Sequence, residues 1–244
     1  PAVLQATTDL GAALKNEGAE GETLTRYQAL QTALNGLDSK SLSGVGWWPD
    51  GYDRFTAALT AMQALREQIT LDAGLILDPW LETYMLMQMG TQQTPDLIER
   101  IGRMASVGQS SISSGQFTLQ SRLQMRDLRS RIGDARDQLV KAAASLKAKQ
   151  YAGMEPWTAQ YDTSLQLLDN ELKVLDDGVF GGSIKLDTAG FERSIDAMLE
   201  SLGALRVQSL TSMDARLDYY RAHANTQFIP MAATFSLLAL AALC

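Results

Sequence analysis

The sequence contains almost none of the residues from which soft-metal sites and nucleophilic catalytic sites are built. It has one cysteine, Cys244, and one histidine, His223. No internal disulfide can form, so the cysteine content says nothing about the redox compartment. A zinc ligand set cannot be assembled, and a Ser-His or Cys-His arrangement would have to use His223. The segment VFGGS (179–183) lacks the spacing and flanks of a phosphate-binding loop. We therefore expect no catalytic site, no metal and no cofactor.

Aromatic residues, prolines and positive charge are also scarce. Aromatics make up 7% of the 244 residues, there are 6 prolines, and no alternating Val/Ile/Thr runs occur. The scarcity disfavours strands, while abundant Ala, Leu, Gln and Ser favour helices. Apolar residues at 45% and charged residues at 20% exclude a disordered chain. The net charge of −7 argues against a nucleic-acid partner, whose phosphates require a cationic surface.

The C-terminus carries the longest apolar run. Residues 228–244, FIPMAATFSLLALAALC, include no charged or amide side chain, whereas a membrane-spanning helix needs roughly 20 such residues. We interpret 227–244 as the start of a truncated transmembrane helix, and 1–226 as a domain outside the membrane. Because the chain opens with Pro1, we expect a piece of a longer protein. A buried C-terminal core helix is the alternative, although a soluble helix normally keeps a polar face.

Apolar residues recur at steps of three and four, as in helices packed in a bundle. Breakers between these runs predict helices near 2–37 (interrupted at 16–22), 50–77, 79–113, 117–149, 156–177 and from 188 onward. At about 1.5 Å per residue these helices reach roughly 33–55 Å. The sequence thus predicts an all-α fold of about six antiparallel helices in an elongated up-down bundle. Two stacked four-helix bundles are favoured, and a single elongated bundle is the alternative.

Each of the later predicted helices has one row of apolar core positions. The rows are Met125, Leu128, Ile132, Ala135, Leu139, Ala142 and Leu146, then Tyr161, Leu165, Leu168, Leu172, Leu175 and Val179, then Phe191, Ile195, Met198, Leu202 and Leu205. In the last helix the row then jumps five places to Leu210 and continues through Met213, Leu217 and Tyr220. Such a jump would rotate the buried face.

At two prolines, Pro79 and Pro95, the chain could either turn between two separate helices or continue as one kinked helix. Asp78 and Pro79 suit an N-cap and a first helical residue, so we expect a tight corner there, with a kinked helix as the alternative. At Thr94–Pro95 we expect a kink or restart inside one long element. Asp187 or Thr188 is placed to cap the last helix.

Four arginines are candidate ligand contacts. Arg66 falls on an apolar row with Phe55, Leu59, Met62, Ile69, Ala73 and Ile76, where it either meets an anion or extends outward while the row moves to Leu65. Arg122, Arg129 and Arg136 repeat every seven residues beside the core row. They either hold an anionic ligand by bidentate contacts or form salt bridges to neighbouring helices or a second subunit.

Aromatic and methionine side chains form two further candidate surfaces. Trp47 and Trp48 stand where a loop enters a helix, and either line a pocket mouth or cover the end of the bundle. Tyr84 stands beside Met85, Met87 and Met89. Together they offer an adaptable binding surface, although methionines at helical spacing more often belong to a core.

Several segments resemble the extracytoplasmic sensor region of bacterial transmembrane receptors, including chemoreceptors and sensor histidine kinases. They are LDPWLETYMLM (77–87), LIERIGRM (97–104) and GQFTLQSRLQMRDLRSRI (115–132). Residues 187–220 resemble the membrane-returning helix of these regions, and the resemblance spans most of 70–226. It departs at Met85, where such elements commonly carry a second aromatic residue.

The resemblance implies an all-helical, bimodular periplasmic sensor domain at the bacterial inner membrane, held between two transmembrane helices. It also implies a signal-relay module, an output domain and a homodimer. It names no ligand, although the arginines favour a small organic anion. A membrane-anchored helical scaffold or partner-binding protein without a small ligand is the alternative function.

Overall fold

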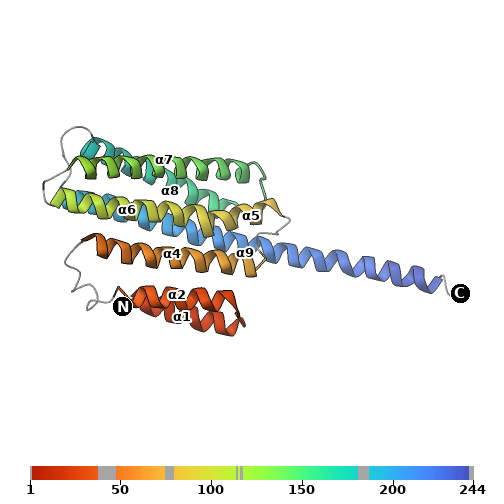
Figure 1. Ribbon diagram of the computed structural model, residues 1–244. Coiled ribbons are helices and arrows are strands. Elements are labelled where there is room, and N and C mark those ends of the chain that lie inside the picture. The colour runs from red at the N-terminus through yellow and green to blue at the C-terminus, as the bar shows by residue number, and fades with distance from the viewer. Residues whose placement is uncertain are drawn as a thin grey trace. The chain divides into compact units, whose positions relative to one another are not determined.

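A computed structural model describes residues 2–37, 48–74, 80–113, 115, 118–180 and 187–241 (Figure 1). Throughout these ranges the regular elements are helices, which confirms the predicted all-α class. The chain divides into two compact units, residues 1–77 and 78–244. Asp78 and Pro79 lie outside the described residues, as does Trp47, and Trp48 is described only in its backbone.

The first unit contains α1 (Ala2–Asn16), α2 (Glu22–Asn35) and α4 (Trp48–Asp72). The predicted interruption at 16–22 is a turn between two helices, because Gly18 and Gly21 have positive φ angles of 70° and 59°. Figure 1 shows α1 and α2 side by side. The Tyr27 hydroxyl on α2 donates to the Thr7 carbonyl oxygen at 3.0 Å, which fixes that pairing.

The core row predicted for α4 is wrong at three of its positions, Phe55, Met62 and Ala73, which are exposed. Phe55 and Met62 are 50% and 48% exposed, whereas Ala58 and Leu65 are 5% and 2% exposed. Seven residues after Leu65, Asp72 accepts a hydrogen bond from the Thr23 hydroxyl of α2. The face of α4 that meets α2 therefore runs through Ala58, Leu65 and Asp72. The predicted seven-residue spacing is present, but it begins three residues after Phe55.

The second unit is a bundle of four long helical segments, whose arrangement can be followed in Figure 1. They are α5 (Leu81–Gln88) continued through η2 (Met89–Gln93) into α6 (Thr94–Ser113), then α7 (Leu119–Lys147), then α8 (Glu155–Leu175) continued by η3 (Asp176–Phe180), then α9 (Thr188–Ala241). α6 packs against α7 and α9, and α8 packs against α9. These bounds agree with the predicted helices to within a few residues.

The core of this unit follows the predicted rows closely. Buried residues that the rows contain are Met125, Ile132, Leu139 and Leu146 of α7, Tyr161, Leu168, Leu172 and Leu175 of α8, and Phe191, Ile195, Met198, Leu202 and Leu205 of α9. The Asp187 carboxylate accepts from the Gly190 backbone N–H at 2.7 Å, which confirms the predicted cap of α9.

The jump of five places predicted in α9 does not replace the earlier row. After Leu205 that row continues through the buried residues Ser209, Ser212 and Arg216. Of the predicted shifted row, Met213 is buried and Leu210 is half-buried. Ser209 tolerates full burial because its hydroxyl donates to the Leu205 carbonyl oxygen at 2.9 Å and accepts from the Trp157 indole N–H at 3.1 Å. Polar residues occupy the row here, so an apolar pattern could not follow it.

No helix within the described ranges combines the length and the apolar character that crossing a bilayer requires.

Candidate functional site

The long first helix of the second unit is interrupted by a π-helical turn, η2, at Met89–Gln93. The Thr94 N–H donates to the Met89 carbonyl oxygen, five residues back instead of four. Pro95 follows at once; it has no N–H, and its ring would clash with the carbonyl four residues back in a regular helix. The wider turn relieves that clash, and turns of this kind are frequent at functional sites. Thr94–Pro95 therefore lies inside one long element, as predicted.

The π turn keeps the buried face of this helix continuous. The fully buried positions are Thr83, Leu86, Met89, Thr94, Leu97, Ile101 and Met104. Their spacing is three or four residues everywhere except between Met89 and Thr94, where it is five. The one spacing of five residues in this buried row therefore falls within η2.

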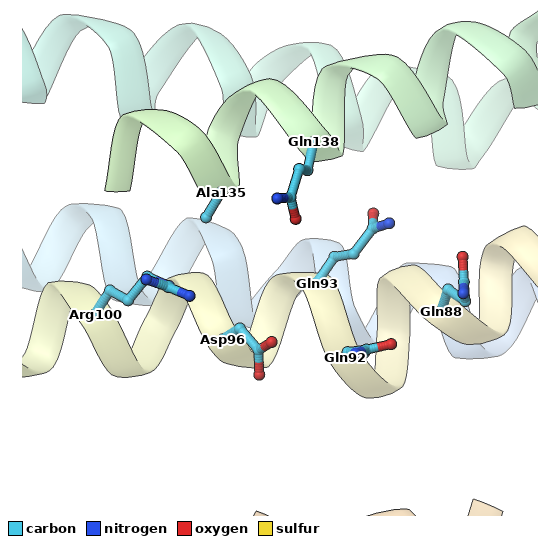
Figure 2. A pocket seen from close by; sticks show the side chains of 7 residues that line it. All are labelled: Gln88, Gln92, Gln93, Asp96, Arg100, Ala135 and Gln138. Carbon is cyan, nitrogen blue, oxygen red and sulfur yellow. The ribbon is translucent and has the colours of Figure 1, made fainter. Parts of the chain in front are cut away.

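A polar pocket of about 230 Å³ lies between η2–α6 and α7. Seven residues line it: Gln88, Gln92, Gln93, Asp96, Arg100, Ala135 and Gln138. Figure 2 shows Gln93 and Gln138 extending into the space between the two helices from opposite sides. Positions 88, 92, 96 and 100 recur every four residues and so share one face of the helix. The pocket therefore presents mainly carboxamides, with one guanidinium and one carboxylate.

Two polar atoms of the lining side chains are buried without a hydrogen-bond partner among the described groups of the protein. They are Gln93 Oε1 and the Arg100 Nε–H. The neighbouring Thr94 hydroxyl shares this property. Leaving one such group unpaired costs about 1–3 kcal/mol, so native folds rarely retain several at one place. Three such atoms lie together here beside an open pocket, and this combination makes the pocket the candidate binding site.

The opposite side of the π turn contacts α9. The Arg206 Nε–H donates to the Gly90 carbonyl oxygen at 3.2 Å. Leu210 lies so close that a Cβ atom at position 90 would be 2.7 Å from its Cδ2. The absence of a side chain at Gly90 thus allows α9 to approach the same turn that lines the pocket.

A second polar cluster surrounds Arg216 of α9. Its guanidinium bonds Glu82 Oε1 at 3.0 Å and the Tyr220 hydroxyl at 2.9 Å, and the Tyr220 hydroxyl also donates to Glu82. The rings of Tyr151, Tyr219 and Tyr220 lie 4.6–4.8 Å from the guanidinium carbon. Such ring contacts favour a desolvated cation.

The pKa values in this cluster reflect burial and hydrogen bonding. Burial raises the pKa of Glu82. The hydrogen bonds from Tyr220 and Arg216 together lower it by more than burial raises it, so the pKa lies below the usual value. Burial raises the pKa of Tyr151 to about 12. Arg216 and Glu82 pair their charges and so join α9 to α5, while the Arg216 Nε–H and the Tyr151 hydroxyl are buried there without a hydrogen-bond partner among the described groups.

The predicted arginine stripe makes contacts between helices. Arg129 holds Asp176 by two hydrogen bonds of 2.9 and 2.8 Å, and Arg136 holds Asp169 at 2.9 and 2.7 Å. These salt bridges are what the second interpretation of the stripe expects. Arg122 is exposed near the start of α7. The three arginines do not converge on the pocket.

The remaining predicted residues have different environments. Arg66 is half-buried on α4 of the first unit, next to Leu65, which is buried. The Tyr84 hydroxyl accepts from the Gln88 amide at 2.7 Å, which puts it next to the pocket. Met87 and Met89 are buried at 4% and 0% exposure and belong to the core.

Sequence reasoning did not identify the pocket residues Gln93 and Arg100. The available signal was the row at 88, 92, 96 and 100, which is polar throughout and crosses Pro95. Gln138, which lines the pocket from the other side, is far from this row in the sequence. Only the packing of α7 against α6 brings Gln138 close to it.

No group of three or more potential metal ligands occurs among the residues that the structure describes. No protein-family model, curated protein or solved structure matches this sequence.

Proposed function

We propose that the chain is the extracytoplasmic sensor domain of a bacterial transmembrane signalling receptor of the chemoreceptor or sensor histidine kinase type. Its helices bind a small molecule on the periplasmic side, and α9 conveys the resulting displacement to the membrane. The division of the chain into two helical units supports the bimodular, two-bundle architecture. The working receptor is a homodimer in this proposal.

One observation carries the proposal: the π turn contacts both the pocket and α9. Gln92 and Gln93 line the pocket, while Gly90 in the same turn accepts from Arg206 and leaves room for Leu210. A change in the pocket therefore acts directly on α9. Packed helices of receptors shift by about 1–2 Å in such transitions.

The continuity of α9 supports the second half of the mechanism. This helix is part of the bundle from Thr188 and runs as one element to Ala241. Its last part coincides with the apolar run that begins at Phe228. A displacement along the helix axis or around it would therefore reach that run without crossing a loop.

Membrane attachment can be tested with the one native cysteine. We expect the 244-residue chain to float with phospholipid vesicles, and Cys244 to be protected there from a charged maleimide. The control is Cys244→Ser combined with Ser145→Cys, whose exposed thiol should be labelled with or without vesicles. Rapid labelling of Cys244 in the presence of vesicles would overturn the membrane assignment.

A displacement measurement separates the sensor from a scaffold. Spin labels at Leu123 of α7 and Val207 of α9, which are 58% and 62% exposed, report the distance between those helices once Cys244 is replaced by Ser. For a sensor, adding a small carboxylate such as L-malate or L-lactate should shift that distance. Membrane insertion with an unchanged distance for all carboxylates tried would favour the scaffold.

A further inference from the structure

We propose that the pocket between η2–α6 and α7 binds a small carboxylate that also carries a hydroxyl or ammonium hydrogen-bond donor. The inference rests on the proposed sensor function, which requires a binding site but does not specify one. The inference assigns that binding site to Gln93, Arg100 and Gln138, which the sequence pattern did not suggest.

The guanidinium of Arg100 selects the charge of the ligand. A guanidinium has five N–H donors and no acceptor, and the Nε–H of Arg100 is buried without a partner, so an acceptor that reached it from the pocket would satisfy it. Carboxylates suit that role best, because their oxygens match the planar donor geometry of arginine. Two other arginines of this unit, Arg129 and Arg136, already hold aspartates by bidentate contacts.

The carboxamide of Gln93 selects the second group of the ligand. Its buried Oε1 is an acceptor and requires a donor. A hydroxyl or ammonium group next to the carboxylate supplies one. Gln138 faces Gln93 across the pocket and has both a donor and an acceptor to complete the contacts (Figure 2).

The volume of the pocket limits the size of the ligand. At about 30 Å³ per water molecule, 230 Å³ corresponds to roughly seven or eight waters. That space suits a molecule of about ten non-hydrogen atoms or fewer, which is the size of a hydroxy acid or a small amino acid. A nucleotide or an oligosaccharide would extend well outside this space.

The test is isothermal titration of the 244-residue chain with pairs of acids that differ in one donor. The pairs are L-malate with succinate, and L-lactate or L-alanine with propionate, and sorbitol serves as a neutral polar control. We expect at least one member with the extra donor to bind, and its partner without the donor to bind roughly threefold to tenfold more weakly. Saturation should raise the unfolding midpoint by roughly 5–10 °C.

Variants locate the site. Arg100→Gln should weaken binding roughly tenfold to a hundredfold, because a charge-assisted hydrogen bond is lost. Gln93→Met keeps the size of the side chain and should weaken binding roughly threefold to tenfold. The matched controls on exposed positions of α7, Arg131→Gln and Gln124→Met, should bind as the native chain does. Gln93→Met keeps the test decisive if Arg100→Gln does not fold.

Two results would overturn the inference. One is the absence of heat and of thermal stabilisation with every acid of the panel, or tighter binding of sorbitol than of any acid. The other is binding that Arg100→Gln and Gln93→Met leave unchanged. Either can occur while Cys244 remains protected by vesicles, so failure here is distinguishable from failure of the membrane-receptor proposal.

Discussion

The Nε–H of Arg206 and the carbonyl oxygen of Gly90 are joined by a hydrogen bond of 3.2 Å that links α9 to the π turn. The two residues are 116 positions apart in the sequence. In a π turn the backbone hydrogen bonds are spaced more widely, which leaves carbonyl groups available to other donors. Arg206 uses one of them, and the contact also brings Leu210 over Gly90.

Replacing Gly90 by Ala should destabilise the second unit and displace α9. The new Cβ would lie 2.7–2.8 Å from Leu210 Cδ2 and Cγ, so we expect a loss of about 1–3 kcal/mol in unfolding free energy. Denaturant titration followed by circular dichroism measures it. The matched control is Gly102→Ala on α6, whose Cβ meets nothing within 4 Å and should stabilise by about 0.5–1 kcal/mol. Equal effects of the two substitutions would contradict the close approach.

Replacing Ser209 by Ala should leave the Trp157 indole N–H buried without an acceptor. We expect a loss of about 1–3 kcal/mol in unfolding free energy, because the N–H cannot reach water. Ser145→Ala on the exposed face of α7 is the control and should change stability by less than about 0.5 kcal/mol. A Ser209→Ala variant as stable as the control would show that this hydrogen bond contributes little.

Replacing Glu82 by Gln should destabilise the second unit by about 1–2 kcal/mol at neutral pH, because Arg216 loses its charged partner. The loss should depend on pH. The pKa of Glu82 lies below its ordinary value near 4.5 in the folded chain, so the folded state resists protonation more than the unfolded state does. The stability due to this carboxylate is therefore fully present above pH 4.5 and is lost as the pH falls through the lowered folded value.

Unfolding curves of the native chain and the Glu82→Gln variant, recorded between neutral pH and pH 3, test that dependence. The gap between them should narrow as the pH drops. The exposed Glu200→Gln serves as the control, for which we expect little difference at any pH. A gap that stays constant down to the lowest pH would mean that the Glu82 charge is not what holds Arg216.

A double-mutant cycle on Arg129→Gln and Asp176→Asn should give a small coupling energy between α7 and η3. The two side chains are 28% and 43% exposed, so we expect about 0.3–1 kcal/mol, most of it lost in roughly 1 M NaCl. The pair Arg131 and Asp127, both 59% exposed on α7, provides the reference and should couple by no more than about 0.5 kcal/mol. Coupling that does not respond to salt would contradict an electrostatic origin.

Sequence patterns predict this fold well where the core is apolar. Leu168, Leu172 and Leu175 of α8 were found because burial requires apolar side chains at helical spacing. The same rule holds only in part in α9 after Leu205, where Met213 is buried as predicted but Ser209 and Arg216 are buried as well, with hydrogen-bond partners. It also failed in α4, where the face that meets α2 includes Asp72.

The candidate site was less accessible to sequence reasoning. A pocket depends on which polar side chains of different helices lie opposite one another, as Gln93 and Gln138 do, and no local pattern encodes that pairing. The sequence favours arginines as ligand contacts because a charge beside an apolar core row is unusual. Two of them, Arg129 and Arg136, proved to hold neighbouring helices together, whereas Arg100 had no such signal.

The single extra residue that η2 holds has a further geometric consequence. In a helix with one extra residue, the wide turn that contains this residue can move along the helix while both ends of the helix stay fixed. If the wide turn moved by one turn toward Leu81, the residues it passed would rotate by about 100° around the helix axis. Gln88 would then leave the row that it forms with Gln92, and the pocket would lose part of its wall, although neither end of the helix had moved.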